Sequence, residues 1–297
     1  MKNGKIQGWI IYPEYVARKS DNAFGWLCDE AAACGIELRI VIIETLNIGY
    51  GNGSHLYCNG REVLEMPDFV IIRTYDSVVT RFFERRGIQV INSSRSMELC
   101  KNKMLTHEIL TANGIPTPHT IYSPQGCYDY EMLCGEFGAR EFITKRTDGA
   151  KGEDVYLVGS AEELEHAIRA CAGNCICQQF ISNSRGRDVR MWVLDGEVIG
   201  SVLRASDSSF ISNYSQGGFA QQFTPPTEAI QLAVQSAQAL GVRFSGIDLL
   251  FGDDGFIVNE VNGNAGFRTL SLTGDNSLPH RLFSHLARTL NESQTLK

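Results

Sequence analysis

The sequence predicts an α/β fold divided into several domains, on three observations. The chain has 297 residues, which is enough for two or three domains of ordinary size. Hydrophobic residues make up 43% of it and charged residues 21%, proportions typical of a globular protein. Near the N-terminus, apolar segments of strand length alternate with helical patterns, which favours a small parallel sheet.

Charge and composition exclude several classes of protein. The net charge of −7 argues against a nucleic-acid scaffold. No apolar run approaches the roughly 18 residues needed to cross a membrane, and the N-terminus lacks signal-peptide features. We therefore expect a cytoplasmic protein that binds neither nucleic acid nor membrane. The nine cysteines include no CxxC pair, which indicates ordinary free thiols.

Residues 1–98 are expected to form an N-terminal α/β domain. The strand candidates are 5–12, 36–43, 69–72 and 88–91, and the helix candidates are 21–33 and 78–86. The glycine-rich stretch 49–54 is interpreted as a loop or a hairpin turn, because no helical pattern follows it.

Two further domains are predicted at 99–181 and 182–297. A helix over 96–113 ends at Gly114, and Pro116 and Pro118 mark a junction. A polar loop is expected over 205–218. The expected strands are 119–122, 141–145, 154–158, 175–181, 188–194 and 198–204, and the expected helices are 128–137, 160–171, 227–240 and one from about 278.

The segment from Ser245 to Arg268 has the most informative pattern. It indicates two apolar strands, one carrying Asp248 and the other Glu260, with Asn262 on the same face as Glu260. Two carboxylates and an amide oxygen on one face would form a hard-ligand set suited to Mg²⁺ held together with phosphates. The alternative is a hairpin whose acidic side chains face water.

This prediction depends on the turn between the two strands. A three-residue turn, Asp253 to Gly255, would pair Gly252 with Phe256 and place the two acids directly opposite each other. A turn of two or four residues would place them on opposite faces of the sheet.

A second group of residues suggests phosphate binding. Lys145 ends a predicted strand just before the loop from Gly149 to Gly152, where backbone N–H groups could approach an anion. Lys103 lies on the helix at the domain junction. No Walker A motif occurs, and a solvated hairpin is the alternative explanation.

Polar motifs continue in order along the chain. Gln178 to Ile181 ends a strand at a possible adenine-binding hinge, and Asp188 and Arg190 share one face of the next strand. Arg204 lies on the partner of that strand, and Ser212 and Asn213 lie in the polar loop. Taken one at a time, each could be an ordinary surface or turn residue.

The order of these motifs resembles the ATP-grasp superfamily, and more narrowly its RimK-like branch of amino-acid ligases. The resemblance covers nearly the whole chain. It implies an N-terminal parallel-sheet domain followed by two ATP-grasp subdomains that hold ATP between two sheets. The matching segments are Asn102-Lys103, Phe142–Lys145, Gln178–Ile181, Arg187–Arg190, Ser212-Asn213 with Gly217-Gly218, Gly246–Asp248 and Asn259–Asn262.

The resemblance also implies roles for individual residues. ATP phosphates would contact Lys103, Lys145, the Gly149–Gly152 loop, Ser212 and Asn213. Gln179 and Phe180 would form the adenine hinge, and Asp188 would lie on the ribose side. One or two Mg²⁺ ions, or Mn²⁺, would bind Asp248, Glu260 and Asn262. Arg190 and Arg204 would stabilise the transferred phosphoryl group.

The sequence departs from the family pattern at two places. Gln179 stands where many relatives have Glu, and the segment after Asn262 differs from the common Ser-Pro-Gly. That segment would face the substrates, so Asn264 and Arg268 are candidate substrate contacts. Arg268 could pair with a carboxylate or could be a surface arginine.

The implied function is an ATP-dependent carboxylate–amine ligase acting through an acyl-phosphate. The resemblance suggests that it adds glutamate or another amino acid to a small molecule, peptide or protein, and a homo-oligomer is an open alternative to a monomer. The competing hypotheses are an ATP-grasp small-molecule kinase and an inactive nucleotide-binding module.

Overall fold

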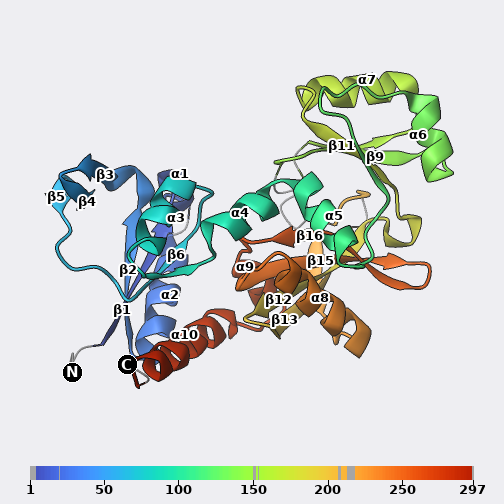
Figure 1. The fold of residues 1–297 in the computed structure, drawn as a ribbon. Coiled ribbons are helices and arrows are strands. Elements are labelled where there is room, and N and C mark those ends of the chain that lie inside the picture. Colours follow the sequence, from blue (N-terminus) through green and yellow to red (C-terminus); the bar gives the residue numbers. More distant parts are fainter. Residues whose placement is uncertain are drawn as a thin grey trace. The chain divides into compact units, whose positions relative to one another are not determined.

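The computed structural model describes residues 5–19, 21–149, 152, 154–206, 209–212 and 218–295. Its contacts divide the chain into two compact units (Figure 1). Unit 1 contains residues 1–97 and 276–297, and unit 2 contains residues 98–275. Among the described residues, no helix is both long and apolar enough to span a membrane.

Unit 1 is built on a four-stranded parallel sheet, as the alternating pattern predicts. The strand order is β2-β1-β6-β7, and every neighbouring pair is parallel. The β6 strand is rich in Ile and Val, and its residues Phe69 to Ile72 are all buried. The strands are β1 (Ile6–Tyr12), β2 (Ile36–Ile42), β6 (Phe69–Ile72) and β7 (Gln89–Ile91), and the helices α1 (Glu14–Ala17), α2 (Asp21–Ala33) and α3 (Ser77–Glu84).

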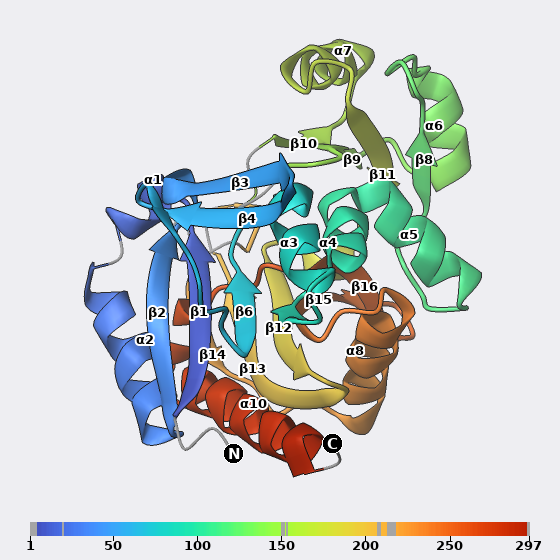
Figure 2. The ribbon, with the colours of Figure 1, turned by 60° about the vertical axis from the view of Figure 1, so that its left-hand side comes forward.

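The glycine-rich stretch 49–54 forms the tip of a hairpin. A short 3-10 turn, η1 (Ile43–Thr45), leads into β3 (Leu46–Gly51), which pairs with β4 (Gly53–Cys58). A two-residue strand, β5 (Arg61–Glu62), completes this sheet. Figure 2 shows the hairpin at the end of the parallel sheet where β2 ends. The hairpin interpretation of this stretch is therefore confirmed.

The C-terminal helix α10 (Leu278–Thr295) contacts α2 and belongs to unit 1. Its buried residues recur at helical spacing and form one apolar face: Leu278, Leu282, Phe283, Leu286 and Leu290. The predicted domain 182–297 included this helix, whereas the structure groups it with the N-terminal residues. The reason is that the apolar face of α10 packs against α2, which lies far from it in the sequence. The division of residues 99–275 into two subdomains stays a prediction.

The predicted helix over 96–113 is wrong in one respect, because the structure has two helices there. They are α4 (Ser94–Lys101) and α5 (Lys103–Ala112). Asn102 separates them with extended backbone, and its side chain accepts hydrogen bonds from the backbone N–H groups of Met104 and Leu105. An asparagine cap of this kind competes with continuation of the helix.

Unit 2 contains a four-stranded antiparallel sheet in the order β10-β9-β11-β8. Phe142 and Cys177 face the helices α6 and α7 and lie in one apolar core with them. The intervening residues Ile143, Lys145 and Gln178 therefore face the other side of the sheet. The elements are β8 (Thr120–Tyr122), β9 (Phe142–Arg146), β10 (Val155–Val158), β11 (Cys175–Gln179), α6 (Tyr130–Phe137) and α7 (Ala161–Ala170).

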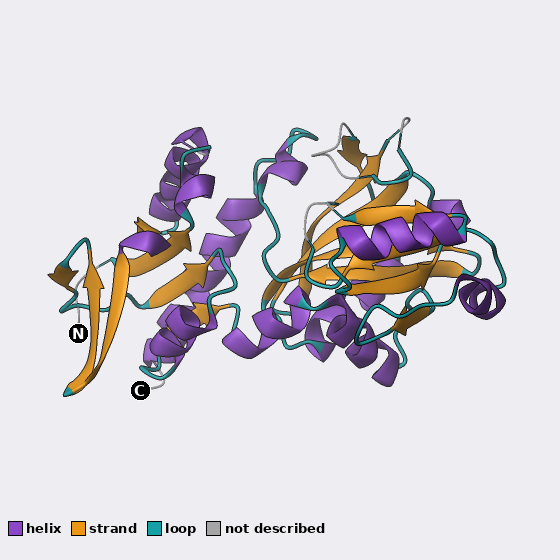
Figure 3. Ribbon diagram, turned by 90° about the horizontal axis from the view of Figure 1, so that it is seen from above, coloured by secondary structure: helices purple, strands orange, loops and turns teal. Residues whose placement is uncertain are grey.

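A five-stranded antiparallel sheet in the order β14-β13-β12-β15-β16 completes unit 2. Val189, Met191 and Ile247 pack in one core with residues of α8, so the alternate residues Asp188, Arg190 and Asp248 face away from α8. Seen from above, helices flank the strands of this unit (Figure 3). The elements are η2 (Ser182–Ser184), β12 (Arg187–Leu194), β13 (Glu197–Ala205), β14 (Phe219–Gln222), α8 (Thr227–Ala239), β15 (Phe244–Gly252), β16 (Gly255–Asn262) and α9 (Arg268–Ser271).

The β15–β16 hairpin confirms one prediction and corrects another. Asp248 lies directly opposite Glu260, as predicted. The turn, however, has two residues rather than three, because Gly252 pairs with Gly255. A β-bulge between Asp248 and Leu249 leaves Asn259 as an extra residue on β16 and brings the two acids back into register.

Candidate active site

A pocket lies between the two sheets of unit 2 and gathers most of the predicted site residues. The smaller sheet contributes Ile143, Lys145 and Gln178, and the larger sheet contributes residues of β12, β13, β15 and β16. The predicted residues that line the pocket are Lys103, Lys145, Gly149, Gly152, Gln179, Phe180, Asp188, Arg204, Ser212, Asp248 and Glu260.

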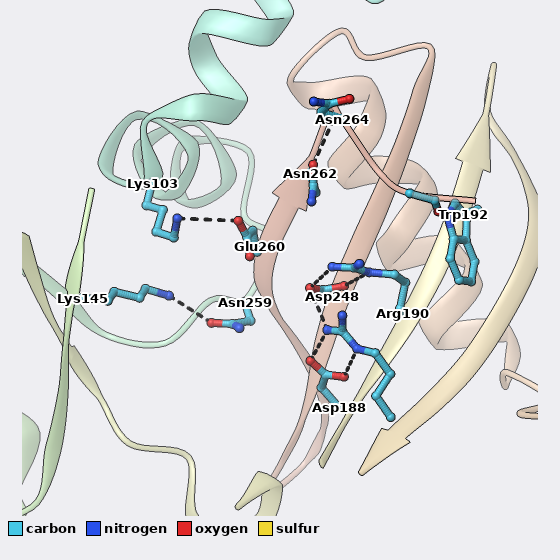
Figure 4. Close-up of polar contacts among 12 residues, drawn as sticks. Lys103, Lys145, Asp188, Arg190, Trp192, Asp248, Asn259, Glu260, Asn262 and Asn264 are labelled. Atoms are coloured by element: carbon cyan, nitrogen blue, oxygen red, sulfur yellow. Dashed lines mark hydrogen bonds and ion pairs between the residues drawn. The ribbon is translucent and has the colours of Figure 1, made fainter. Parts of the chain in front are cut away.

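The two predicted phosphate lysines lie in this pocket on different elements. Lys103 is the first residue of α5, and its Nζ lies 2.5 Å from the carbonyl oxygen of Gly149 and 3.6 Å from Glu260 Oε1. Lys145 on β9 donates through Nζ to Asn259 Oδ1 at 3.1 Å (Figure 4). Two cationic side chains therefore approach the β16 strand from the opposite side of the pocket.

Lys145 has an unusual electrostatic environment. Burial, followed by repulsion from Lys103, lowers its pKa from 10.5 to about 7, although Glu260 and Asp248 act in the opposite direction. Its side chain is 5% exposed. A lysine in this state can become fully charged when a polyanion enters the pocket.

Asn259 lies in a segment that matches the family pattern, but no role was predicted for it from the sequence. The bulge at this position allows the neighbouring residues Asn259 and Glu260 both to line the pocket, whereas a regular strand would send them to opposite faces. The signal available in the sequence was an asparagine directly before Glu260 in an otherwise apolar strand, but the bulge itself has no marker such as glycine.

Four charged residues on the larger sheet bond to one another. Arg190 and Arg204 both donate to Asp248, and Arg204 also donates to Asp188. Burial acts to raise the pKa of Asp248, but the two arginines outweigh it and the net shift is downward. For Asp188 burial prevails over Arg204 and raises the pKa. The two predicted catalytic arginines thus form one connected group with Asp188 and with Asp248, one of the three predicted metal ligands.

Apolar side chains line another part of the pocket. They come from β9, β10, the polar loop and β15: Ile143, Val155, Phe210, Ile211 and Leu250. Gln179 and Phe180, the predicted hinge, lie in the same lining. An apolar slot of this kind suits a flat heterocycle. The four residues other than Ile143 were not identified from the sequence because no motif marks them.

Gln178 is held in one orientation by buried neighbours. Its Nε2 donates to His107 Nε2 at 2.9 Å and to Thr120 Oγ1 at 2.7 Å. His107 Nδ1 lies 2.5 Å from Thr117 Oγ1. Burial, then the charges of Lys145 and Lys103, lower the pKa of His107 to about 3, so the ring is neutral at pH 7.

Four predicted site residues lie outside the pocket lining: Arg190, Asn262, Asn264 and Arg268. Asn262 Oδ1 accepts from the backbone N–H of Asn264 at 2.9 Å, and Arg268 is exposed at the start of α9. Asn213 lies outside the described residues. These positions stay predictions as ligand contacts.

The segment after β16 is fixed against the larger sheet. The Trp192 indole donates to the carbonyl oxygen of Gly266 at 3.0 Å. A Cβ on Gly246 would lie 2.9 Å from the Cβ of Ala265, so the glycine permits close approach. Ala265 and Phe267 are buried, whereas Gly266 and Arg268 are exposed. Gly266 and Arg268 are therefore the residues of this segment that face outward.

The oxygen donors at this site suit a hard divalent cation. Asp248 accepts three hydrogen bonds from arginines, one at Oδ1 and two at Oδ2, so Oδ1 keeps acceptor capacity for a metal ion. The Glu260 side chain is 28% exposed, and Asn259 and Asn262 add amide oxygens. Among the described residues, no group of three or more His, Cys, Asp or Glu side chains is gathered at a metal-binding distance, so amide oxygens would have to complete such a set.

Solved structures with the same fold define the class of protein. The ATP-grasp ligase PsnB, complexed with a minimal precursor, Mg and ADP, superposes with a TM-score of 0.70 at 20% identity over 98% of each chain. The D-alanine–D-alanine ligase from Bacillus anthracis gives a TM-score of 0.70 at 15% identity, over 97% of this chain and 99% of that chain. The fold is therefore that of the ATP-grasp ligases.

Sequence comparison narrows the class. A model of the RimK-like ATP-grasp domain matches residues 100–284, and the chain belongs to that family. It is 34% identical over 257 residues to beta-citrylglutamate synthase B of Homo sapiens, covering 80% of this chain and 66% of that protein. It is 30% identical over 281 residues to a probable alpha-L-glutamate ligase of Maridesulfovibrio salexigens, covering 91% and 92%. The chain thus spans just under two thirds of the human protein's length.

Proposed function

We propose that this protein is an ATP-dependent ligase that joins a carboxylate to an amine through an acyl-phosphate. The observation that carries the proposal is the convergence of Lys103 and Lys145 with Asp248 and Glu260 on one pocket between two sheets. Cations placed opposite carboxylates suit a polyphosphate that is bound together with a divalent metal ion. The family membership and the named activities of the relatives support the same proposal.

The proposed nucleotide is ATP. Its base would lie against the apolar lining near Gln179 and Phe180, and its phosphates would lie toward Lys103, Lys145, Gly149 and Ser212. Lys103 already bonds the Gly149 carbonyl, so it links the glycine loop to α5 and brings the loop to the phosphate end of the pocket. Each lysine offers a point charge that can follow the phosphate oxygens.

The proposed metal ligands are Asp248, Glu260 and Asn262. The ion they would hold is Mg²⁺, or Mn²⁺, and when bound it would neutralise charge on the phosphates. Asp248 is held from behind by the two arginines, so its position is fixed before any ligand arrives. Glu260 has more freedom, because its nearest cation, Lys103, is 3.6 Å away.

The chain's own residues act mainly by position and charge. A substrate carboxylate oxygen attacks the γ-phosphorus, the bond to the bridging oxygen breaks, and ADP leaves. The amine nitrogen then attacks the acyl carbon, the bond to the phosphate oxygen breaks, phosphate leaves, and the amine proton passes to solvent. Arg190 and Arg204 would stabilise the charge that spreads over the transferred group. Enclosure between the sheets protects the acyl-phosphate from water.

The proposed amine substrate is glutamate or another amino acid, and the acid is a small molecule, peptide or protein. This part of the proposal is supported by the names of the relatives, which include glutamate ligases and N-acetylaspartylglutamate synthase A of Homo sapiens. Asn264 and Arg268 are the proposed substrate contacts on the segment after β16. A cytoplasmic location and a homo-oligomeric state stay predictions.

Hydroxylamine trapping tests the reaction class. The purified protein is incubated with Mg²⁺, ATP and a panel of carboxylic acids and alcohols, with and without hydroxylamine, and ADP release, hydroxamate and phosphorylated products are measured. A hydroxamate that depends on both ATP and acid supports the ligase. A stable phosphorylated alcohol without hydroxamate would instead identify a kinase, and no turnover with any acid or alcohol, despite nucleotide binding, would leave the inactive module.

A further inference from the structure

Two neighbouring residues of β16 each meet one lysine from the other side of the pocket (Figure 4). Glu260 Oε1 lies 3.6 Å from Lys103 Nζ, and Asn259 Oδ1 accepts a hydrogen bond from Lys145 Nζ at 3.1 Å. Lys103 begins α5 and Lys145 lies on β9, so both contacts cross the pocket. In a regular strand, adjacent side chains point to opposite faces of the sheet and could not both make such contacts.

The β-bulge makes this arrangement possible, because it leaves Asn259 as an extra residue between Val258 and Glu260. Val258 is fully buried in the core that includes α8, and its backbone N–H donates to the carbonyl oxygen of Pro116 at 2.8 Å. Side-chain packing and a backbone hydrogen bond thus fix the strand beside the bulge. Asn259 therefore has a defined place at the pocket.

Asn259 is the residue that fixes where the ammonium group of Lys145 lies. Among the described residues, no other group accepts a hydrogen bond from Lys145 Nζ. The lysine is 5% exposed, so water competes little for its ammonium group. Lysine has a flexible four-carbon stem, and a fixed acceptor at its end removes much of that freedom before a ligand arrives.

The amide group of Asn259 matters because it has no charge. An amide oxygen accepts a hydrogen bond from the ammonium group and leaves the positive charge available to a polyanion. A carboxylate at the same position would also orient Lys145, but it would offset the charge of the lysine and repel phosphate oxygens. Lys103, by contrast, lies beside the carboxylate of Glu260.

We propose that Asn259 is a positioning residue for Lys145, whose amide oxygen holds the ammonium group at the phosphate end of the pocket without offsetting its charge. The inference rests on the proposed function, since it concerns the same nucleotide site. Asn259 acts through Lys145, so its contribution to nucleotide binding disappears when the ammonium group is removed. A direct contact of Asn259 with the nucleotide or with a metal ion would contribute whether or not the lysine is present.

ADP binding tests the inference without the substrates. Affinities for ADP with Mg²⁺ are measured by calorimetry at about pH 6.5, below the Lys145 pKa of about 7. The proteins are the wild type, Asn259→Leu, Lys145→Met and the double variant. We expect Asn259→Leu to weaken ADP binding about tenfold, which is typical for loss of a hydrogen bond to a charged group. In the Lys145→Met background it should change the affinity by less than about twofold.

The matched control is Asn113→Leu, the same substitution at the exposed C-terminal end of α5, which should bind ADP as the wild type does. If Asn259→Leu fails to fold, Asn259→Ala takes its place in the same comparison. The smaller side chain also removes the amide oxygen.

Asn259→Asp separates positioning from a merely structural role, because aspartate has nearly the same size as asparagine and keeps an acceptor. It should weaken ADP binding about tenfold or more, because its negative charge offsets that of Lys145. Thermal stability should equal or exceed that of the wild type, because the carboxylate attracts the buried ammonium group. A residue with only a structural role would not lower the affinity while stability is kept.

Three results would contradict these expectations. Additive losses in the double variant would overturn the inference and assign Asn259 a direct contact with the nucleotide or the metal ion. ADP binding by Asn259→Asp that is as strong as in the wild type, or stronger, would overturn it as well, and would favour a metal ligand at this position. A wild-type protein that does not bind ADP would refute the proposed function itself, and with it the inference.

Discussion

At the residue scale, Lys145 shows how the pocket is prepared for a polyanion. Its pKa near 7 means that the buried side chain is largely neutral at pH 8 when no ligand is present. An unfolded lysine titrates near 10.4, so the unfolded chain binds more protons between about pH 7 and 10. The protein therefore becomes more stable as the pH rises through that window, because Lys145 no longer has to be buried in its charged form. Below that window, the free-energy cost of burying the charged side chain is greatest.

Nucleotide binding at pH 8 should accordingly take up close to one proton, because the phosphates restore the charge of Lys145. Calorimetry of ADP binding in buffers of different ionisation enthalpy measures the uptake. Lys145→Met should bind ADP more weakly and abolish the uptake. Equal uptake by both proteins would show that another group carries the proton.

Gln178 leads to a prediction about base selection. Thr117 and Thr120 both donate to the carbonyl oxygen of Pro118, so their hydroxyl oxygens accept from His107 and Gln178 respectively. His107 Nε2 must then be an acceptor, and both N–H groups of Gln178 are used. The amide oxygen of Gln178 is the group left for a ligand, and an oxygen selects an amino group.

Gln178→Leu should therefore lose about tenfold in its preference for ATP over inosine triphosphate, which has a carbonyl oxygen in place of the amine. Competition binding with both nucleotides measures the preference. Gln221→Leu, on the exposed part of β14, is the matched control and should keep it. An unchanged preference in Gln178→Leu would place base selection on the backbone alone.

At the element scale, Gly186 positions the polar loop that borders the pocket. It has φ +68°, and a Cβ there would lie 2.7 Å from the carbonyl oxygens of Ser206 and Ser209. Its N–H donates to the carbonyl oxygen of Phe210, and its own carbonyl accepts from the N–H of Ser206. The loop that carries Phe210, Ile211 and Ser212 into the pocket thus depends on a residue without a side chain.

Gly186→Ala should weaken ADP binding several-fold and lower the free energy of unfolding by about 1–2 kcal/mol or more, from left-handed strain alone. Gly25→Ala is the control, because Gly25 lies in α2 with no atom near the new Cβ. That substitution should stabilise the protein by about 0.5–1 kcal/mol and leave binding unchanged. Chemical denaturation and calorimetry provide both measurements.

Some helices and strands could be predicted from the sequence and others could not. β6 and the starts of β11 and α8 match their predicted positions, because apolar periodicity and flanking breakers mark them. The break at Asn102 was missed since apolar periodicity continues across it, and β14 was missed because its four residues are mostly polar or exposed.

The site was predictable to a similar degree. Most of the predicted nucleotide residues line one pocket, since their order along the chain reflects the fold. The pairing of Asp188 and Arg190 with partners on β13 and β15 could not be predicted. It depends on strand register across the sheet, which local sequence specifies weakly.

At the scale of the whole molecule, the C-terminal residues stabilise the unit that the N-terminal residues begin. Phe283 on α10 is fully buried, and α10 contacts α2. Phe283→Ala should cost about 3–5 kcal/mol by leaving a cavity. Because α10 belongs to unit 1, hydrogen exchange should accelerate in β1 and β6 more than in β12 and β15.

Ser284→Ala, one position further on the exposed side of the same helix, is the control and should leave exchange unchanged in both units. Hydrogen exchange followed by mass spectrometry resolves these segments. Uniform acceleration in both units after Phe283→Ala would show that the chain unfolds as one cooperative body rather than two.

The bulge at Asn259 has a consequence for comparing this chain with its relatives. A tight two-residue turn and a three-residue turn can both bring Asp248 opposite Glu260, provided that the tighter one is followed by a single extra residue on the return strand. The turn can therefore differ by one residue among relatives without moving either carboxylate, provided that the bulge is gained or lost at the same time. Both arrangements contain the same number of residues between the two acids, so relatives with either turn align with this chain without a gap, and the bulge rather than the chain length distinguishes them.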